Sequence, residues 1–185
     1  MDMEKNAVCR AIDYTGRNVI VTGGASGAGV GIAHRFAEAG ANVAITYHSN
    51  GAAAAEKVEA LRAFGGKAEA YALDQRDVDS IPGVLNAIAR DFGGIDVLMN
   101  NAGIYPHQNN LDMSREEWDE MQESNTRGVY FLCQAAAKIM KEQKDGGAII
   151  NVSSINATCP SDTLVHYGTS KAAVEFLTRG LAHDW

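Results

Sequence analysis

The sequence predicts an α/β protein built on a doubly wound parallel sheet. Short β-branched runs alternate with longer segments of helical periodicity, which is the pattern of βαβ units. The runs at 97–99 and 148–150 are apolar at consecutive positions, as expected for strands covered by helices on both faces. A glycine-rich segment at 22–29 follows the first run and opens onto a helical pattern, as in dinucleotide-binding folds.

The alternation of patterns divides the chain into a lead-in and one domain. Residues 1–17 lack periodicity and are expected to form a loose lead-in, and residues 18–185 form the domain. The expected strands cover 18–23, 42–47, 67–73, 95–100 and 147–153. The expected helices cover 29–39, 51–64, 77–92, 114–144 and 167–184. Ser114 and Glu117 have the spacing of a capping box at the start of the fourth helix, and Gly146-Gly147 ends it.

Composition narrows the class of protein. The 185 residues, 46% hydrophobic and 21% charged, suit one soluble globular domain. A net charge of −7 argues against a nucleic-acid or anionic-membrane partner, because both need a basic surface. An acidic N-terminus and the lack of a run of about 18 apolar residues predict a cytoplasmic protein without a membrane span. Cys9, Cys133 and Cys159 lack ligand spacing and are expected to be reduced thiols, so no metal is assigned.

The glycine-rich segment predicts a phosphate-binding turn. Its glycines Gly23, Gly27 and Gly29 depart from the G-x-G-x-x-G spacing, and Ser26 and Ala28 lie between them. Backbone N–H groups in such a turn can face a phosphate at a helix N-terminus without side chains intervening. A tight βα connection without a ligand is the alternative interpretation.

The end of the second strand favours NADP(H) over NAD(H). An acidic residue that would bind the adenosine ribose hydroxyls is absent there. Instead, Tyr47 is followed by His48, Ser49 and Asn50, which can accommodate a 2′-phosphate without the repulsion of a carboxylate. These residues could also simply form a turn.

Three further polar features are candidates for chemistry. Tyr167 and Lys171 lie four residues apart, so on a helix they share a face, and an ammonium there favours the phenolate form of a tyrosine. Ser154, next to Ser153, follows a strand at the carboxyl edge of the sheet, where ligands of such folds bind. Asn125 falls on an apolar stripe of its helix and should be buried, either as a core amide or as a functional one. The stripe consists of Trp118, Met121, Val129, Leu132, Ala136 and Ile139.

Together these residues resemble the short-chain dehydrogenase/reductase family, in the branch with the TGxxxGxG cofactor turn. The resemblance covers residues 18–184 and rests on that turn, on Asn100-Asn101-Ala102-Gly103, on Asn125, on Ser154 placed 13 residues before Tyr167, and on Lys171. It implies a Rossmann-type fold. It also implies homodimers or homotetramers built by the helices that carry Asn125 and Tyr167.

The resemblance implies a role for each candidate residue. Tyr167 would be the general acid or base, Ser154 would hydrogen-bond the substrate oxygen, and Lys171 would favour the phenolate and hold the nicotinamide ribose. Asn125 would anchor a water that relays protons, and Asp74 would meet the adenine ring. The implied catalytic set is Asn125, Ser154, Tyr167 and Lys171. The implied cofactor-binding set is Gly23, Ser26, Gly27, Ala28, Gly29, His48, Ser49, Asn50, Asp74, Gln75, Asn101, Ala102, Gly103, Tyr167 and Lys171.

The sequence departs from the family pattern in two places. Ala28 replaces the usual isoleucine of the glycine turn, a change that leaves the main-chain phosphate contacts in place. The sequence also stops at Trp185, near the end of the helix that carries Tyr167, whereas family members continue with further strands and a substrate lid. The fifth strand is therefore expected to have an exposed edge, and the substrate pocket is expected to be incomplete.

The sequence therefore favours an oxidoreductase that transfers a hydride between NADP(H) and a ketone or secondary alcohol, with NAD(H) as the other possible cofactor. A fragment or redox sensor that binds NADP(H) without turnover is the alternative, and an assembly protein is a weaker one. The segments 104–113 and 155–166 are expected to border the substrate entrance, but their mixed polarity names no substrate.

Overall fold

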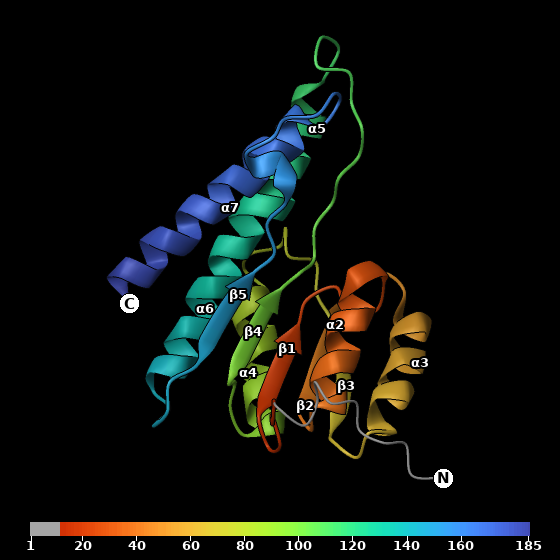
Figure 1. The fold of residues 1–185 in the computed structure, drawn as a ribbon, viewed down its shortest axis with the longest axis vertical. Helices are drawn as coiled ribbons and strands as arrows, with labels where there is room; N and C mark the ends of the chain where they lie inside the picture. The colour runs from red at the N-terminus through yellow and green to blue at the C-terminus, as the bar shows by residue number, and fades with distance from the viewer. Residues whose placement is uncertain (1–11) are drawn as a thin grey trace.

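The computed structural model describes residues 12–185 and contains one parallel sheet with helices on both faces (Figure 1). Its strand order is β3-β2-β1-β4-β5. The strands are β1 (Asn18–Val21), β2 (Asn42–Tyr47), β3 (Ala68–Ala72), β4 (Val97–Asn100) and β5 (Ala148–Asn151). The helices are α2 (Gly27–Glu38), α3 (Gly51–Arg62), α4 (Ile81–Phe92), α5 (Arg115–Gln122), α6 (Val129–Lys141) and α7 (Val165–Asp184). The predicted fold class, a doubly wound parallel sheet, is confirmed.

The core forms two layers because successive side chains of a strand point to opposite faces of the sheet. In β1, Val19 and Val21 pack with α2 and α3, while Ile20 packs with α4 and α6 on the other face. All three are at most 1% exposed. Burying such a side chain contributes roughly 1.5–3 kcal/mol, so both apolar faces of the strand stabilise the fold.

The long helix predicted at 114–144 is divided in the structure. A π-helical segment, η1 (Glu123–Gly128), separates α5 from α6. The ladder changes there from i→i+4 to i→i+5 bonds, yet the predicted stripe stays buried across the segment, from Met121 through Asn125 to Val129. Trp118, which that stripe placed in the core, is 38% exposed. Residues predicted on the stripe beyond the segment, such as Leu132, are buried.

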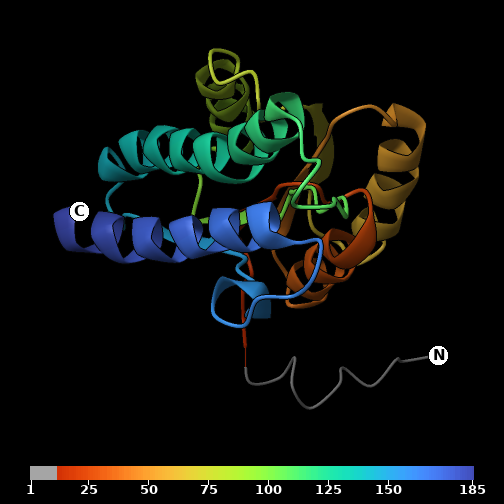
Figure 2. The ribbon, with the colours of Figure 1, turned by 90° about the horizontal axis from the view of Figure 1, so that it is seen from above.

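Other helix boundaries differ from the prediction by a few residues. The helix α4 begins at Ile81 rather than 77, because residues 74–80 form turns in which Asp77 N donates to Asp74 O and Ser80 N donates to Asp77 O. The helices α2 and α7 each begin two residues earlier than predicted. Figure 2 shows α7 running beside α6 over the β5 end of the sheet, where Val174 packs with Val129 and Cys133.

Three further predictions concern the edge of the sheet, the lead-in before β1 and the absence of a membrane span. The strand β5 is one edge of the sheet, and its Ile150 is 41% exposed, as the predicted open edge requires. Most of the predicted lead-in and Cys9 lie outside the described residues. Within the described part, Tyr14 at the end of that lead-in packs edge-on against Phe36. No helix between residues 12 and 185 is long and apolar enough to cross a membrane.

Candidate functional site

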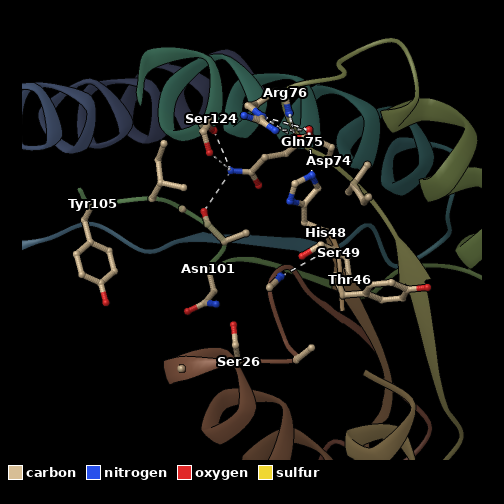
Figure 3. A pocket seen from close by; sticks show the side chains of 18 of the residues that line it. Ser26, Thr46, His48, Ser49, Asp74, Gln75, Arg76, Asn101, Tyr105 and Ser124 are labelled. Carbon is tan, nitrogen blue, oxygen red and sulfur yellow. Dashed lines mark hydrogen bonds and ion pairs between the residues drawn. The ribbon is translucent and has the colours of Figure 1, made fainter. Parts of the chain in front are cut away.

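The carboxyl ends of the strands open into one cavity of about 840 Å³ (Figure 3). Its walls come from four places in the sequence: the glycine turn, the ends of β2 and β3, the loop after β4, and the first turns of α7. Ligands of open parallel sheets bind at this edge. The fold therefore brings most of the predicted site residues to one place.

The glycine turn is shaped by backbone requirements. Gly23 and Gly27 have φ angles of +65° and +52°, which side-chain-bearing residues rarely adopt. At Gly29, a Cβ atom would collide with the carbonyl oxygen of Gly23. Ser26 precedes α2, and its side chain does not cap the helix, so the first N–H groups of α2 have no side-chain acceptor there. Gly23, Ser26, Gly27 and Ala28 line the cavity, whereas Gly29 is buried behind them as a spacer.

The loop after β4 is fixed to the end of β1. Thr22 Oγ1 accepts hydrogen bonds from the backbone N–H groups of Asn101 and Ala102, both at 3.0 Å. Asn101 Nδ2 in turn donates to Thr22 O at 3.0 Å. Asn101, Ala102 and Gly103 all line the cavity. These bonds fix the position of the loop relative to the glycine turn.

The ends of β2 and β3 form the opposite side of the cavity. His48, Ser49 and Asn50 line it, and the Asn50 side chain also caps α3 by accepting from Ala53 N at 2.9 Å. His48 Nε2 lies 3.4 Å from Asp74 Oδ2. The pKa of the Asp74 carboxyl is lowered, chiefly by its hydrogen bonds to the Arg76 side chain.

Gln75 also lines the cavity, but its amide is turned into the protein. Its Nε2 donates to Ser124 O at 2.8 Å and to Ala102 O at 3.3 Å. Gln75 is 7% exposed. Its side chain therefore braces the cavity wall against η1 rather than facing a ligand.

Asn125 is fully buried, as predicted, and it does not line the cavity. Its Oδ1 accepts from Ile104 N at 2.9 Å, and its Nδ2 donates to Ile104 O at 2.8 Å. The amide therefore pairs with both backbone groups of one residue of the cavity wall. Asn125 lies in the π-helical segment η1 and holds that wall in place.

Tyr167 and Lys171 lie in the first two turns of α7, and both line the cavity. The ammonium Nζ lies 5.8 Å from the centre of the Tyr167 ring. It donates to Val152 O at 2.7 Å, which leaves two of its three protons for other acceptors. Lys171 is 5% exposed, and burial lowers the pKa of its ammonium. The predicted pairing on one helical face is present.

Ser154 is placed differently from the other candidates. It caps a short 3₁₀ turn, η2 (Ile155–Ala157), and its Oγ accepts from Asn156 N at 3.2 Å. It is partly buried and is not among the residues that line the cavity. The neighbouring Ser153 donates to Glu175 instead.

Sequence reasoning missed several polar residues of the cavity wall, Glu120 and Ser124 among them, and two others lie at or just after the end of a strand. Thr46 Oγ1 accepts from Gly23 N at 3.3 Å, and Arg76 binds Asp74. Both follow or end a predicted strand, which is the signal that could have placed them at the carboxyl edge. Tyr105 lies in the segment predicted to border the entrance, and its ring centre is 6.2 Å from that of Tyr167.

Comparison with known proteins decides the family. The family model described as short chain dehydrogenase matches residues 17–185. The chain belongs to the short-chain dehydrogenase family.

Individual members of this family are similar over most of the chain. L-rhamnose 1-dehydrogenase (NAD(P)(+)) of Azotobacter vinelandii is 42% identical, over 90% of this chain and 66% of its own length. Glucose 1-dehydrogenase 2 of Bacillus subtilis is 34% identical, over 94% of this chain and 67% of its own. The chain thus spans about two thirds of the length of these relatives.

Solved structures agree with this assignment. A short chain dehydrogenase from Burkholderia cenocepacia J2315 in complex with NADP matches with a TM-score of 0.87 and 37% identity, over 92% of this chain and 69% of that one. A short-chain type dehydrogenase/reductase from Mycobacterium marinum matches with a TM-score of 0.89 and 35% identity, over 97% and 73% of the two chains.

Proposed function

We propose that the chain binds NADP(H) in the cavity and serves hydride transfer to or from a ketone or secondary alcohol. The observation that carries this proposal is that the glycine turn and the Tyr167 and Lys171 pair line one continuous cavity. The relatives support it, since those named are dehydrogenases of sugars and one similar structure holds NADP.

The residues present fit a dinucleotide. The N–H groups at the start of α2 would hold the pyrophosphate, because the glycines leave them uncovered. Asp74 would accept from the adenine amino group, and His48, Ser49 and Asn50 would face a ribose 2′-phosphate. Asn101, Ala102, Gly103 and the free protons of Lys171 would hold the nicotinamide half. We propose NADP(H) over NAD(H) because the end of β2 carries no carboxylate.

The bound nicotinamide supplies or accepts the hydride. In reduction, Tyr167 gives its phenolic proton to the carbonyl oxygen, and in oxidation it takes the proton back. The Lys171 ammonium lies 5.8 Å from the centre of the Tyr167 ring, and its positive charge would stabilise the negative charge that develops on the Tyr167 oxygen during proton transfer. Ser154 Oγ accepts from Asn156 but keeps its own proton, which it can donate to the substrate oxygen.

For the Asn125 side chain we propose a different role from the one that the family resemblance implies. The resemblance implies an anchor for a proton-relaying water, but both polar atoms of the Asn125 side chain are taken by Ile104. We therefore propose that this side chain positions the cavity wall beside Tyr167 and does not itself relay protons.

The test combines nucleotide binding with turnover. Titration with NADPH, followed by nicotinamide fluorescence, should show saturable binding. A panel of ketones and sugars should then reveal NADP(H)-dependent turnover that Tyr167→Phe lowers by about a hundredfold or more. Binding without any turnover by the parent chain would instead support the non-catalytic alternative, and absence of binding would refute the proposal.

We also propose that the protein forms a homodimer or homotetramer. Large apolar side chains are exposed on α7 and β5, with Phe176 at 71% and Ile150 at 41%, and this supports an apolar contact with another copy. Light scattering of the purified protein tests the proposal, and a monomer at all concentrations would contradict it.

A further inference from the structure

Arg76 is a charged residue of the cavity to which the proposed function gives no role. It stands two residues after Asp74, in the turn that follows β3. Its Nη2 donates to Asp74 Oδ2 at 2.8 Å, and its Nε lies 3.0 and 3.1 Å from Oδ1 and Oδ2. The Arg76 backbone N–H adds a bond to Oδ1 at 3.0 Å. The guanidinium therefore binds the carboxylate through two of its nitrogens, Nε and Nη2, and this bidentate pair is called the fork below.

The fork is itself fixed by contacts with α5 and η1. Arg76 Nη1 donates to Glu120 Oε1 on α5 at 2.7 Å. Arg127 Nη2 donates to the Arg76 carbonyl oxygen at 3.1 Å. Side chain and backbone of Arg76 are thus both held, so the direction of the Asp74 carboxylate is set by contacts that reach α5 and η1. A lysine could not reproduce this planar arrangement.

The fork leaves one acceptor position open on Asp74. A carboxylate offers about four acceptor positions. Oδ1 already takes the backbone N–H and Nε of Arg76, whereas Oδ2 takes Nη2 and shares the single Nε proton with Oδ1. The remaining neighbour of Oδ2 is His48 Nε2 at 3.4 Å, longer than the usual 2.7–3.2 Å of a hydrogen bond. The His48 side chain is 62% exposed and therefore easily displaced, and Figure 3 shows it between Asp74 and the open cavity.

We propose that Arg76 is a positioning residue for base selection, which holds Asp74 so that its open acceptor position reads the exocyclic amino group of adenine. A purine that carries an oxo group in place of the amino group would set the oxo oxygen against the Asp74 carboxylate oxygen. Both atoms are hydrogen-bond acceptors, so the dinucleotide would bind more weakly. This inference rests on the proposed function, because it assumes that the adenine end of the dinucleotide lies beside Asp74.

The test compares NADPH with its reduced hypoxanthine counterpart, in which an oxo group replaces the amino group. Both are titrated into the same protein sample by nicotinamide fluorescence, so a loss of folded protein cancels in the ratio of dissociation constants. The parent protein should prefer NADPH by about tenfold or more, as expected for one charge-assisted hydrogen bond. Arg76→Ala should reduce the preference to about threefold or less, and Arg76→Lys should give an intermediate value.

Two further variants complete the test. Arg90→Ala removes an exposed guanidinium on α4 that pairs with Asp91 and does not line the cavity, and it should keep the preference of the parent. Asp74→Asn should abolish or reverse it, because an amide N–H can donate to the oxo group. Full preference in Arg76→Ala, or equal binding of both nucleotides by the parent, would overturn the inference while leaving the proposed function standing. Failure of the parent to bind either nucleotide would refute both.

Discussion

Replacing Asn125 by alanine should destabilise the protein far more than the loss of one surface amide. The variant leaves Ile104 N and O without the partners that now lie at 2.9 and 2.8 Å. A buried polar group left unpaired costs about 1–3 kcal/mol. Ile104 is half-buried beside the cavity, so water can partly replace the amide, and we expect a loss of about 2–4 kcal/mol from the free energy of unfolding.

Thermal and urea unfolding, followed by circular dichroism, measure this loss. For a chain of this size each kcal/mol lowers Tm by about 2–4 °C, so Tm should fall by about 4–16 °C. Asn86→Ala is the matched control, because Asn86 is an exposed amide on α4 and its replacement should leave Tm unchanged or slightly raised. A Tm of the Asn125→Ala variant within about 2 °C of the parent would show that Asn125 does not support the cavity wall as argued.

Three further predictions follow from other residues. Gly29→Ala should weaken NADPH binding by about tenfold or more, because the added Cβ would collide with Gly23 O and displace the turn. The control is Gly31→Ala on the same helix, where a Cβ would meet open space and binding should not change. Equal dissociation constants for the two variants would contradict this prediction. His48→Asp should shift the ratio of NADH to NADPH affinity toward NADH by about tenfold or more, since a carboxylate repels a 2′-phosphate; an unchanged ratio would place that phosphate elsewhere. His166 is buried, and neither of its ring nitrogens has a hydrogen-bond partner among the described residues. Burial lowers the pKa of His166, so on acidification the unfolded state binds a proton before the folded state does, and the free energy of unfolding should fall as pH drops below about 6.5. His166→Met should flatten the pH dependence of the urea-unfolding free energy between about pH 6.5 and 5.5, and an equally steep fall in the variant would contradict the assignment.

The sequence could predict the sheet because its signals are local. The runs at 97–99 and 148–150 are apolar at every position, and both are strands in the structure, as predicted. Cover on both faces, which was also predicted, is incomplete for the second run, because Ala148 and Ile150 are exposed. The glycine turn and the Tyr167 and Lys171 pair are likewise defined within a few residues of one another. The cavity wall contains them because parallel strands end at one edge.

What the sequence could not predict depends on partners distant along the chain. Helical periodicity predicts the face of the helix on which Trp118 lies but not what covers that face, so the prediction that Trp118 lies in the core was wrong: it is 38% exposed, although Met121 on the same helix is buried. Arg76 was missed because its charge gains meaning only when the turn after β3 meets Glu120 on α5. The pairing of the Asn125 side chain with Ile104 could not be predicted either, because nothing in the sequence marks Ile104 as its partner.

The geometry of the site is set by the sheet more than by its loops. Thr22 ties the glycine turn to Asn101 at the end of β4. One residue earlier, Asn100 Nδ2 donates across the sheet to Asn151 Oδ1 at 2.9 Å, and this bond fixes the end of β5 against β4. Lys171 then donates to the carbonyl that follows Asn151, so the helix carrying Tyr167 is placed by the same strand ends. A change that shifts the β4 and β5 register would therefore move the phenol relative to the glycine turn, even where neither is altered.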